Sequence, residues 1–144
     1  MASYGVWWTA PAVAENNARI MVSGRKDVAQ WRDNPRFGIR VEITWRYTPD
    51  AEGFPDVNTA DMMEQAENAL EEAFRKDPVA VLTGVFTGDG ERNWIFYTLS
   101  TNIFGRKLNE ALASLPTLPL EIMCENDPQW AAYDEMAEAE IAMD

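Results

Sequence analysis

The chain has 144 residues, a formal net charge of −12 and no histidine. This length suits one domain, residues 1–144, with a substantial core. Without histidine the chain lacks the commonest general base at neutral pH and the commonest imidazole ligand for metals. Its single cysteine, Cys124, cannot form an intramolecular disulfide or supply a zinc site. We therefore expect no metal, no cofactor and no catalytic cysteine.

The negative charge lies mostly toward the C-terminus. Residues 1–50 carry seven Lys and Arg against five Asp and Glu, residues 51–107 carry five against ten, and residues 108–144 carry none against nine. Phosphate is bound mainly by Lys and Arg, so this balance disfavours direct binding to nucleic acid or an anionic membrane. It suits a basic protein partner, although acidic surfaces most often only keep a protein in solution.

No apolar run approaches the roughly 18 to 20 residues of a membrane span, and the first residues lack the pattern of a signal peptide. We expect a soluble, cytoplasmic protein. The N-terminal stretches "YGVWWTA" (4–10) and "ARIMVSG" (18–24) indicate short strands, and "DVAQWRDN" (27–34) indicates a helical turn or loop. The two strands are expected to extend a sheet formed by the rest of the chain.

From Phe37 to Tyr47 every odd position is apolar, while most even positions carry charged side chains. A period of two predicts a strand with one wet face. Turn-forming residues follow, and Asn58 or Thr59 is the expected cap of the next helix. That helix places apolar residues at helical spacing, and its acids are expected on a solvated face. The apolar set is Met62, Ala66, Ala69, Leu70, Ala73 and Phe74; the acids are Glu64, Glu67, Glu71 and Glu72.

The stretch "KDPVAVLTGVF" (76–86) predicts a strand, and "TGDGERNWIFYTLS" (87–100) predicts a turn and a second strand. Asp89-Gly90 between them indicates a hairpin, because glycine tolerates the positive φ of such turns. A second amphipathic helix is expected over 102–115. The stretch "TLPLEIMCE" (117–125) then predicts a strand that turns Cys124 toward the core, and Pro119 makes it an edge strand or delays its start.

From residue 37 to 125 the expected order is strand, helix, strand, hairpin, strand, helix, strand. This is the split β-α-β-β-α-β pattern of ferredoxin-like folds. The predicted fold class is therefore α+β: a ferredoxin-like antiparallel sheet, with N-terminal strand additions and a C-terminal helix over about 127–142.

The C-terminal stretch "DPQWAAYDE" begins with an Asp-Pro pair. Asp127 is the expected N-cap of the last helix, with Pro128 at its first position. Trp130 and Tyr133 fall on one side of this helix with Ala137 and Ile141. The simpler interpretation is that these aromatics dock the helix on the domain. The alternative is a partner-binding site made by Asp127, Trp130, Tyr133, Glu135 and Glu138.

Four fragments in this order resemble a bacterial family, the domain of unknown function family 695. They are "EGFP" (52–55), "MMEQAENALEEAF" (62–74), "LTGVFTGDGERNWIFYT" (82–98) and the Asp-Pro-x-Trp-x-x-Tyr motif of 127–133. The resemblance implies a ferredoxin-like fold and brings no established activity. At the level of fold and acidity alone, the chain is also similar to the ribonuclease E regulator B family of inhibitory binding proteins.

Three functions remain open from the sequence. The first is a small, acidic, non-enzymatic binding or regulatory protein that engages a protein partner. The second is a carboxylate-dependent hydrolase, which would need two close, buried carboxylates in a pocket. The third is an acidic mimic that inhibits a nucleic-acid-binding protein.

Overall fold

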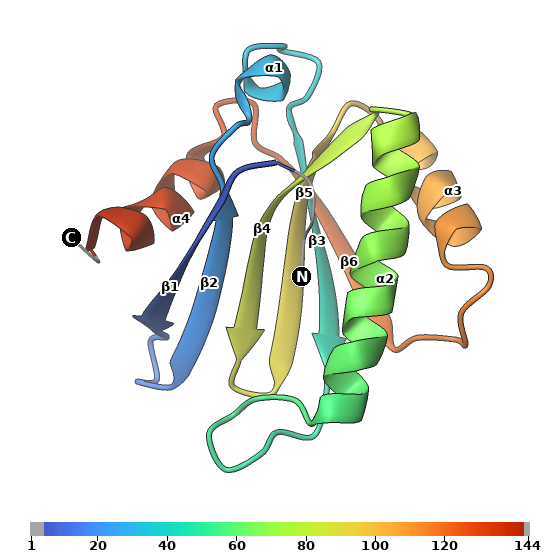
Figure 1. Ribbon diagram of the computed structural model, residues 1–144. Helices are drawn as coiled ribbons and strands as arrows, with labels where there is room; N and C mark the ends of the chain where they lie inside the picture. The colour runs from blue at the N-terminus through green and yellow to red at the C-terminus, as the bar shows by residue number, and fades with distance from the viewer. Residues whose placement is uncertain (1–4, 143–144) are drawn as a thin grey trace.

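The computed structural model describes residues 5–142, the side chains of 140–142 excepted. Within that part of the chain, ten elements follow one another (Figure 1). They are β1 (Trp7–Val13), β2 (Arg19–Arg25), α1 (Ala29–Arg32), β3 (Ile39–Arg46), α2 (Val57–Lys76), β4 (Ala80–Gly88), β5 (Glu91–Thr98), α3 (Thr101–Ala111), β6 (Leu120–Asn126) and α4 (Ala131–Ala142).

All six strands form one sheet in the order β1-β2-β4-β5-β3-β6, and every neighbouring pair is antiparallel. The predicted α+β class is confirmed. Strand β5 lies between β3 and β4, so the two strands that α2 connects are not neighbours. Asp89 and Gly90 turn the β4-β5 hairpin with positive φ angles of 52° and 83°, as expected. Both N-terminal strands extend the sheet beyond β4, also as expected.

The two faces of the sheet carry different helices. Trp94 and Phe96 of β5 belong to the core under α2 and α3, whereas Ile95 and Tyr97 belong to a second core with residues around α1 and α4. Alternate residues of a strand point to opposite faces, so β5 serves both cores. Helices α2 and α3 thus cover one face, while α4 contacts β1, β2 and β4 on the other (Figure 1).

A β-bulge in β4 changes which residues face α2. The register shifts between Leu82 and Gly84, so Leu82 and, after the shift, Val85 both pack with the α2 core. Gly84 then faces the other side, where a Cβ would come within 2.5 Å of the sulfur of Met136 on α4. The glycine therefore allows the close approach of α4.

Helix α2 differs from its prediction at the cap and around its circumference. The N-cap is Asp56, whose side chain accepts a hydrogen bond from the Thr59 amide, rather than Asn58 or Thr59. Glu67 and Glu71 are buried rather than solvated. The buried side is made by Met63, Ala66, Glu67, Leu70, Glu71 and Phe74, which is rotated slightly from the expected apolar face.

Strand β6 lies at the edge of the sheet and starts after Pro119, as expected. The prediction that Cys124 faces the core is wrong, because Cys124 is exposed. It does lie on the α3 side of the sheet, opposite Val41 of β3, but within residues 5–142 no strand covers the outer edge of β6.

Helix α4 begins at Ala131, three residues later than the predicted first position at Pro128. Trp130 has a positive φ of 56° and immediately precedes the helix, which starts at Ala131. Residues 127–130 form a turn instead, closed by a hydrogen bond from the Trp130 amide to the Asp127 carbonyl oxygen. The Ile141 side chain, expected on the docking face, lies outside the described residues.

None of the helices in residues 5–142 is both long and apolar enough to cross a membrane.

Candidate functional site

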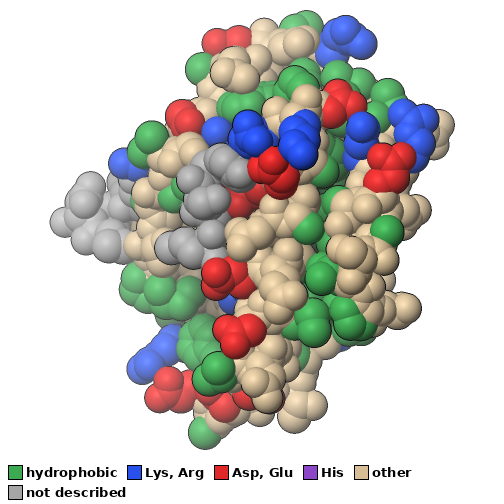
Figure 2. Space-filling view, turned by 45° about the vertical axis from the view of Figure 1, so that its right-hand side comes forward, with side chains coloured by type: hydrophobic (Ala, Val, Ile, Leu, Met, Phe, Trp, Pro, Cys, Tyr) green, Lys and Arg blue, Asp and Glu red, His purple; other side chains and the backbone are tan. Residues whose placement is uncertain are grey.

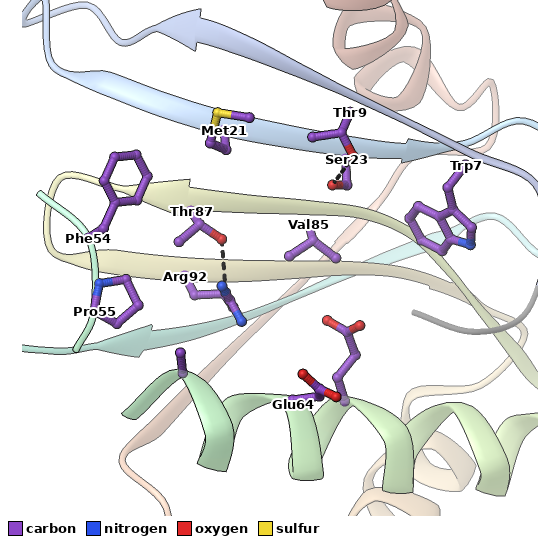
Figure 3. A pocket seen from close by; sticks show the side chains of 12 residues that line it. Trp7, Thr9, Met21, Ser23, Phe54, Pro55, Glu64, Val85, Thr87 and Arg92 are labelled. Atoms are coloured by element: carbon purple, nitrogen blue, oxygen red, sulfur yellow. Dashed lines mark hydrogen bonds between the residues drawn. The ribbon is translucent and has the colours of Figure 1, made fainter. Parts of the chain in front are cut away.

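A cavity of about 460 Å³ lies beside α2. It lies over the part of the sheet to which β1 and β2 belong. Its floor includes Met21 of β2 and Val85 of β4, and α2 forms one wall (Figure 3). Trp7 of β1 and Phe54 of the loop before α2 lie toward opposite ends (Figure 3). This volume is typical of small-molecule sites.

Arg92 brings a guanidinium group to the cavity from β5. Its Nε donates a hydrogen bond of 2.8 Å to the hydroxyl of Thr87, its cross-strand neighbour in β4. Burial lowers the pKa of Arg92 from its ordinary value, and the negative charges of Glu67 and Glu64 oppose this effect. Arginine stays protonated in proteins, so the cavity holds a fixed positive charge.

The end of the Arg92 side chain points into the cavity toward α2 (Figure 3). A guanidinium has five N–H donors, and the hydrogen bond to Thr87 uses one. In the described part of the chain no carboxylate forms a direct ion pair with Arg92. The terminal nitrogens, Nη1 and Nη2, are thus placed to donate to an acceptor inside the cavity.

Two carboxylates of α2 also line the cavity. Glu67 is only 5% exposed, and its Oε1 accepts a hydrogen bond of 2.8 Å from the indole N–H of Trp94, which is fully buried. Glu64 lies one turn earlier on the same wall and is exposed to solvent. Figure 3 shows Glu64 on the α2 side of the cavity, with its carboxylate close to the helix.

The loop between β3 and α2 closes one end of the cavity with Phe54 and Pro55. Asp50 fixes this loop, since its Oδ1 accepts hydrogen bonds from the amides of Glu52 and Phe54 at 2.9 Å. These amides lower the pKa of Asp50. The same loop also contacts the hairpin between β4 and β5, because the amide of Gly90 donates a hydrogen bond to the carbonyl oxygen of Gly53. The aromatic end wall is therefore held in place without a ligand.

A family model described as a family of unknown function, DUF695, matches residues 8–136. The chain belongs to this family. The match runs from the second residue of β1 to the first half of α4, and it includes the cavity-lining residues described above except Trp7. No curated protein and no solved structure matches the chain.

In this DUF695 protein, the side chain of Trp130 packs against the sheet, as expected for a residue that docks the C-terminal helix on the domain. Trp130 is 1% exposed, and its ring stacks on that of Tyr97 with the ring centroids 4.0 Å apart. Its indole N–H donates to the carbonyl oxygen of Phe37 at 2.8 Å. These contacts support the interpretation that Trp130 holds the C-terminal segment on the domain.

Asp127 stabilises the start of α4, although it is not the residue next to the helix. Its two carboxylate oxygens accept hydrogen bonds from the amides of Ala131 and Ala132, and Oδ2 also accepts one of 2.7 Å from the Tyr97 hydroxyl. Burial raises the pKa of Asp127, but these hydrogen bonds outweigh it and the pKa is lowered. Burial is the main cause that raises the pKa of Tyr97. The hydrogen bond to Asp127 and the charge of that carboxylate raise this pKa further.

The other members of the predicted partner site are Tyr133, Glu135 and Glu138, of which only Tyr133 lies beside Trp130. The Tyr133 hydroxyl donates to the carbonyl oxygen of Arg25 in β2. Glu135 and Glu138 are exposed on α4, away from this contact. The structure thus brings Asp127, Trp130 and Tyr133 together at the junction of α4 with the sheet. Partner binding by this set of residues stays a prediction.

Charges of both signs are interspersed on the face where α2 and α3 come forward (Figure 2). Glu72 pairs with Arg75 and Lys76 along α2, and Asp77 pairs with Lys107 of α3. The net negative charge does not produce a surface of one sign on this side of the molecule.

No group of three or more potential metal-binding side chains is found among the described residues.

The sequence analysis missed the importance of Arg92 and Glu67. The period of β5 carried a signal for Arg92, because it lies two residues before the buried Trp94. Glu67 lies three residues before Leu70, and this helical spacing also places it on the buried side.

Proposed function

We propose that the protein is a non-enzymatic binding protein and that a small molecule is its ligand, held in the cavity beside α2. The observation that supports this most is the placement of Arg92. A half-buried guanidinium loses hydration, and this costs free energy unless an acceptor replaces the water. A ligand in the cavity supplies such an acceptor, and Thr87 holds the guanidinium ready for it.

The carboxylates of the cavity favour binding over hydrolysis. A hydrolase would need two carboxylates free to act as proton donor and base. Glu67 faces the cavity wall with one oxygen engaged by Trp94, and Glu64 lies in solvent. This arrangement suits a fixed negative charge at Glu67, with a second acid on the same wall, that orients a ligand.

Amide NMR spectra recorded with a small-molecule library test the proposal. Compounds that bind should shift the amides of Thr87, Arg92 and Glu64, and an Arg92→Gln variant should lose the effect. Arg46→Gln is the matched control, because Arg46 pairs with Glu121 and Glu91 outside the cavity. The proposal fails if no compound shifts cavity amides, or if the shifts persist in Arg92→Gln.

A second candidate function is engagement of a basic protein partner through β6. The outer edge of β6 pairs with no strand of the described chain, and Ile122 and Met123 are 47% and 57% exposed. Such an edge can accept a strand from another protein. The other edge strand, β1, contains Pro11, which lacks an amide donor. If the partner itself binds nucleic acid, the protein would act as its inhibitor.

Affinity capture with the parent and a Met123→Lys variant tests this second candidate. Met123 is exposed, so the charge should spare the fold while opposing a basic strand at the edge. A specific partner should be captured by the parent alone, and its retention should fall as salt rises, because screening weakens long-range attraction. Equal capture by both proteins, or retention indifferent to salt, would refute it.

A further inference from the structure

Resting on the proposed function, we infer that the ligand is a small zwitterion of the amino-acid class, with a carboxylate, an ammonium group and an apolar side chain. The cavity offers a separate element for each of these three parts. The guanidinium of Arg92 fits the carboxylate, the carboxylates of α2 fit the ammonium, and the aromatic ends fit the side chain.

The carboxylate is assigned to Arg92 by the geometry of its hydrogen bonds. The bond from Nε to Thr87 fixes the plane of the guanidinium and leaves the two terminal nitrogens facing the cavity. Paired N–H groups of this kind match the two oxygens of a carboxylate. Thr87 is itself only 8% exposed, and its hydroxyl lies at the base of the guanidinium, so the acceptor must come from the cavity side.

The ammonium group is assigned to the wall formed by α2. Glu64 and Glu67 are three residues apart on one helix and therefore neighbours on its surface. Both lie close enough to Arg92 for their charges to act on it. A ligand carboxylate bound at Arg92 would place its α-substituents near these two acids. An ammonium at that position would be attracted by both.

The charges of the cavity disfavour a simple anion. An anion would be attracted by Arg92 but repelled by Glu67, which is buried on the opposite wall. A simple cation would be attracted by the acids. It would leave the terminal nitrogens of Arg92 without an acceptor, and this costs free energy in a half-buried site. A zwitterion satisfies both signs at once.

The apolar side chain of the ligand is assigned to the two ends of the cavity, which are formed by aromatic residues. Trp7 and Phe54 lie toward opposite ends, with Met21 and Val85 between them (Figure 3). A cavity of about 460 Å³ has room for a large side chain beside the charged groups. Aromatic walls bind an aromatic ring well, through burial and through ring contacts.

Three compounds that share a phenyl ring separate the contributions of the charges: L-phenylalanine, phenethylamine and phenylpropionate. Their affinities for the full chain are measured by calorimetry or by NMR titration. Phenylalanine should bind about 10- to 100-fold more tightly than either analogue, the range for losing one hydrogen bond to a charged group. Arg92→Gln should reduce phenylalanine to the affinity of phenethylamine, and Glu64→Gln should bring it toward that of phenylpropionate.

Arg92→Lys keeps the charge but loses the paired donors, so its affinity for phenylalanine should lie between those of the parent and Arg92→Gln. Arg46→Gln should bind like the parent, and the amide spectrum of each variant shows whether it is folded. The inference is overturned if an analogue binds as tightly as phenylalanine, or if none of the three binds while other compounds do. In both cases the cavity still binds a ligand and the proposed function stands.

Discussion

The indole N–H of Trp130 and the carbonyl oxygen of Phe37 form a hydrogen bond of 2.8 Å that spans 93 residues of the sequence. Phe37 lies just before β3, and Trp130 just before α4. Trp130 adopts its positive φ at this point, a conformation that bulky residues rarely take unless their surroundings hold them. The side chain of Trp130 therefore helps to anchor the C-terminal segment to the sheet.

Truncation of this anchor should be severely destabilising. Trp130→Ala removes a large buried aromatic, its stacking on Tyr97 and its hydrogen bond, so the free energy of unfolding should fall by about 3 to 5 kcal/mol. Denaturant melts measure this value. Gln129→Ala, at the exposed neighbouring position, should stay within about 0.5 kcal/mol of the parent. A Trp130→Ala protein as stable as the parent would contradict the anchoring role.

Asp127 should make stability depend on pH in the acidic range. Its pKa in the folded protein lies below the ordinary value of 3.8, so the unfolded chain binds the proton more readily. Stability from this group is then complete above about pH 5 and falls as the pH drops through 3.8 toward the folded value. Asp127→Asn should lose this part of the acid dependence when melts are compared between pH 5 and 2.5. Parallel curves for the two proteins would contradict it.

Cys124 should react with a thiol reagent in the folded protein. It is exposed on the edge strand, so modification by an aromatic disulfide reagent should be as complete without denaturant as with it. Cys124→Ser should change stability by no more than about 0.5 kcal/mol, as for other surface positions. Any activity that is detected should survive this change. Labelling that requires denaturant would place the thiol in the core instead.

Patterns that repeat along the chain predicted most of the fold. The alternation before Tyr47, the Asp89-Gly90 turn and the helical spacing of Leu108 and Phe104 each follow from one local rule, and the structure has a strand, a hairpin and a helix there. The α+β class followed from the order of these elements.

The features that failed depend on contacts that no local pattern contains. Asp127 has the residue type of a helix cap, yet the docking of Trp130 puts a turn there first. The bulge after Leu82 changes which residues of β4 face α2, and alternation alone cannot place it. Glu67 is acidic and would be assigned to solvent by type, but Trp94 provides a buried donor for it.

That pairing also gives a test of the cavity wall. Glu67→Ala leaves the indole N–H of the fully buried Trp94 without its acceptor, which should cost about 1.5 to 3 kcal/mol, the range for hydrogen bonds to charged groups. Glu67→Gln keeps an amide oxygen for the same N–H and should cost about 1 kcal/mol or less. Gln65→Ala, at an exposed position of α2, should remain within about 0.5 kcal/mol. Melts of the three variants decide the order. If Glu67→Ala equalled Gln65→Ala, the hydrogen bond would add nothing to stability, and Glu67 could not be the fixed charge that the ligand site requires.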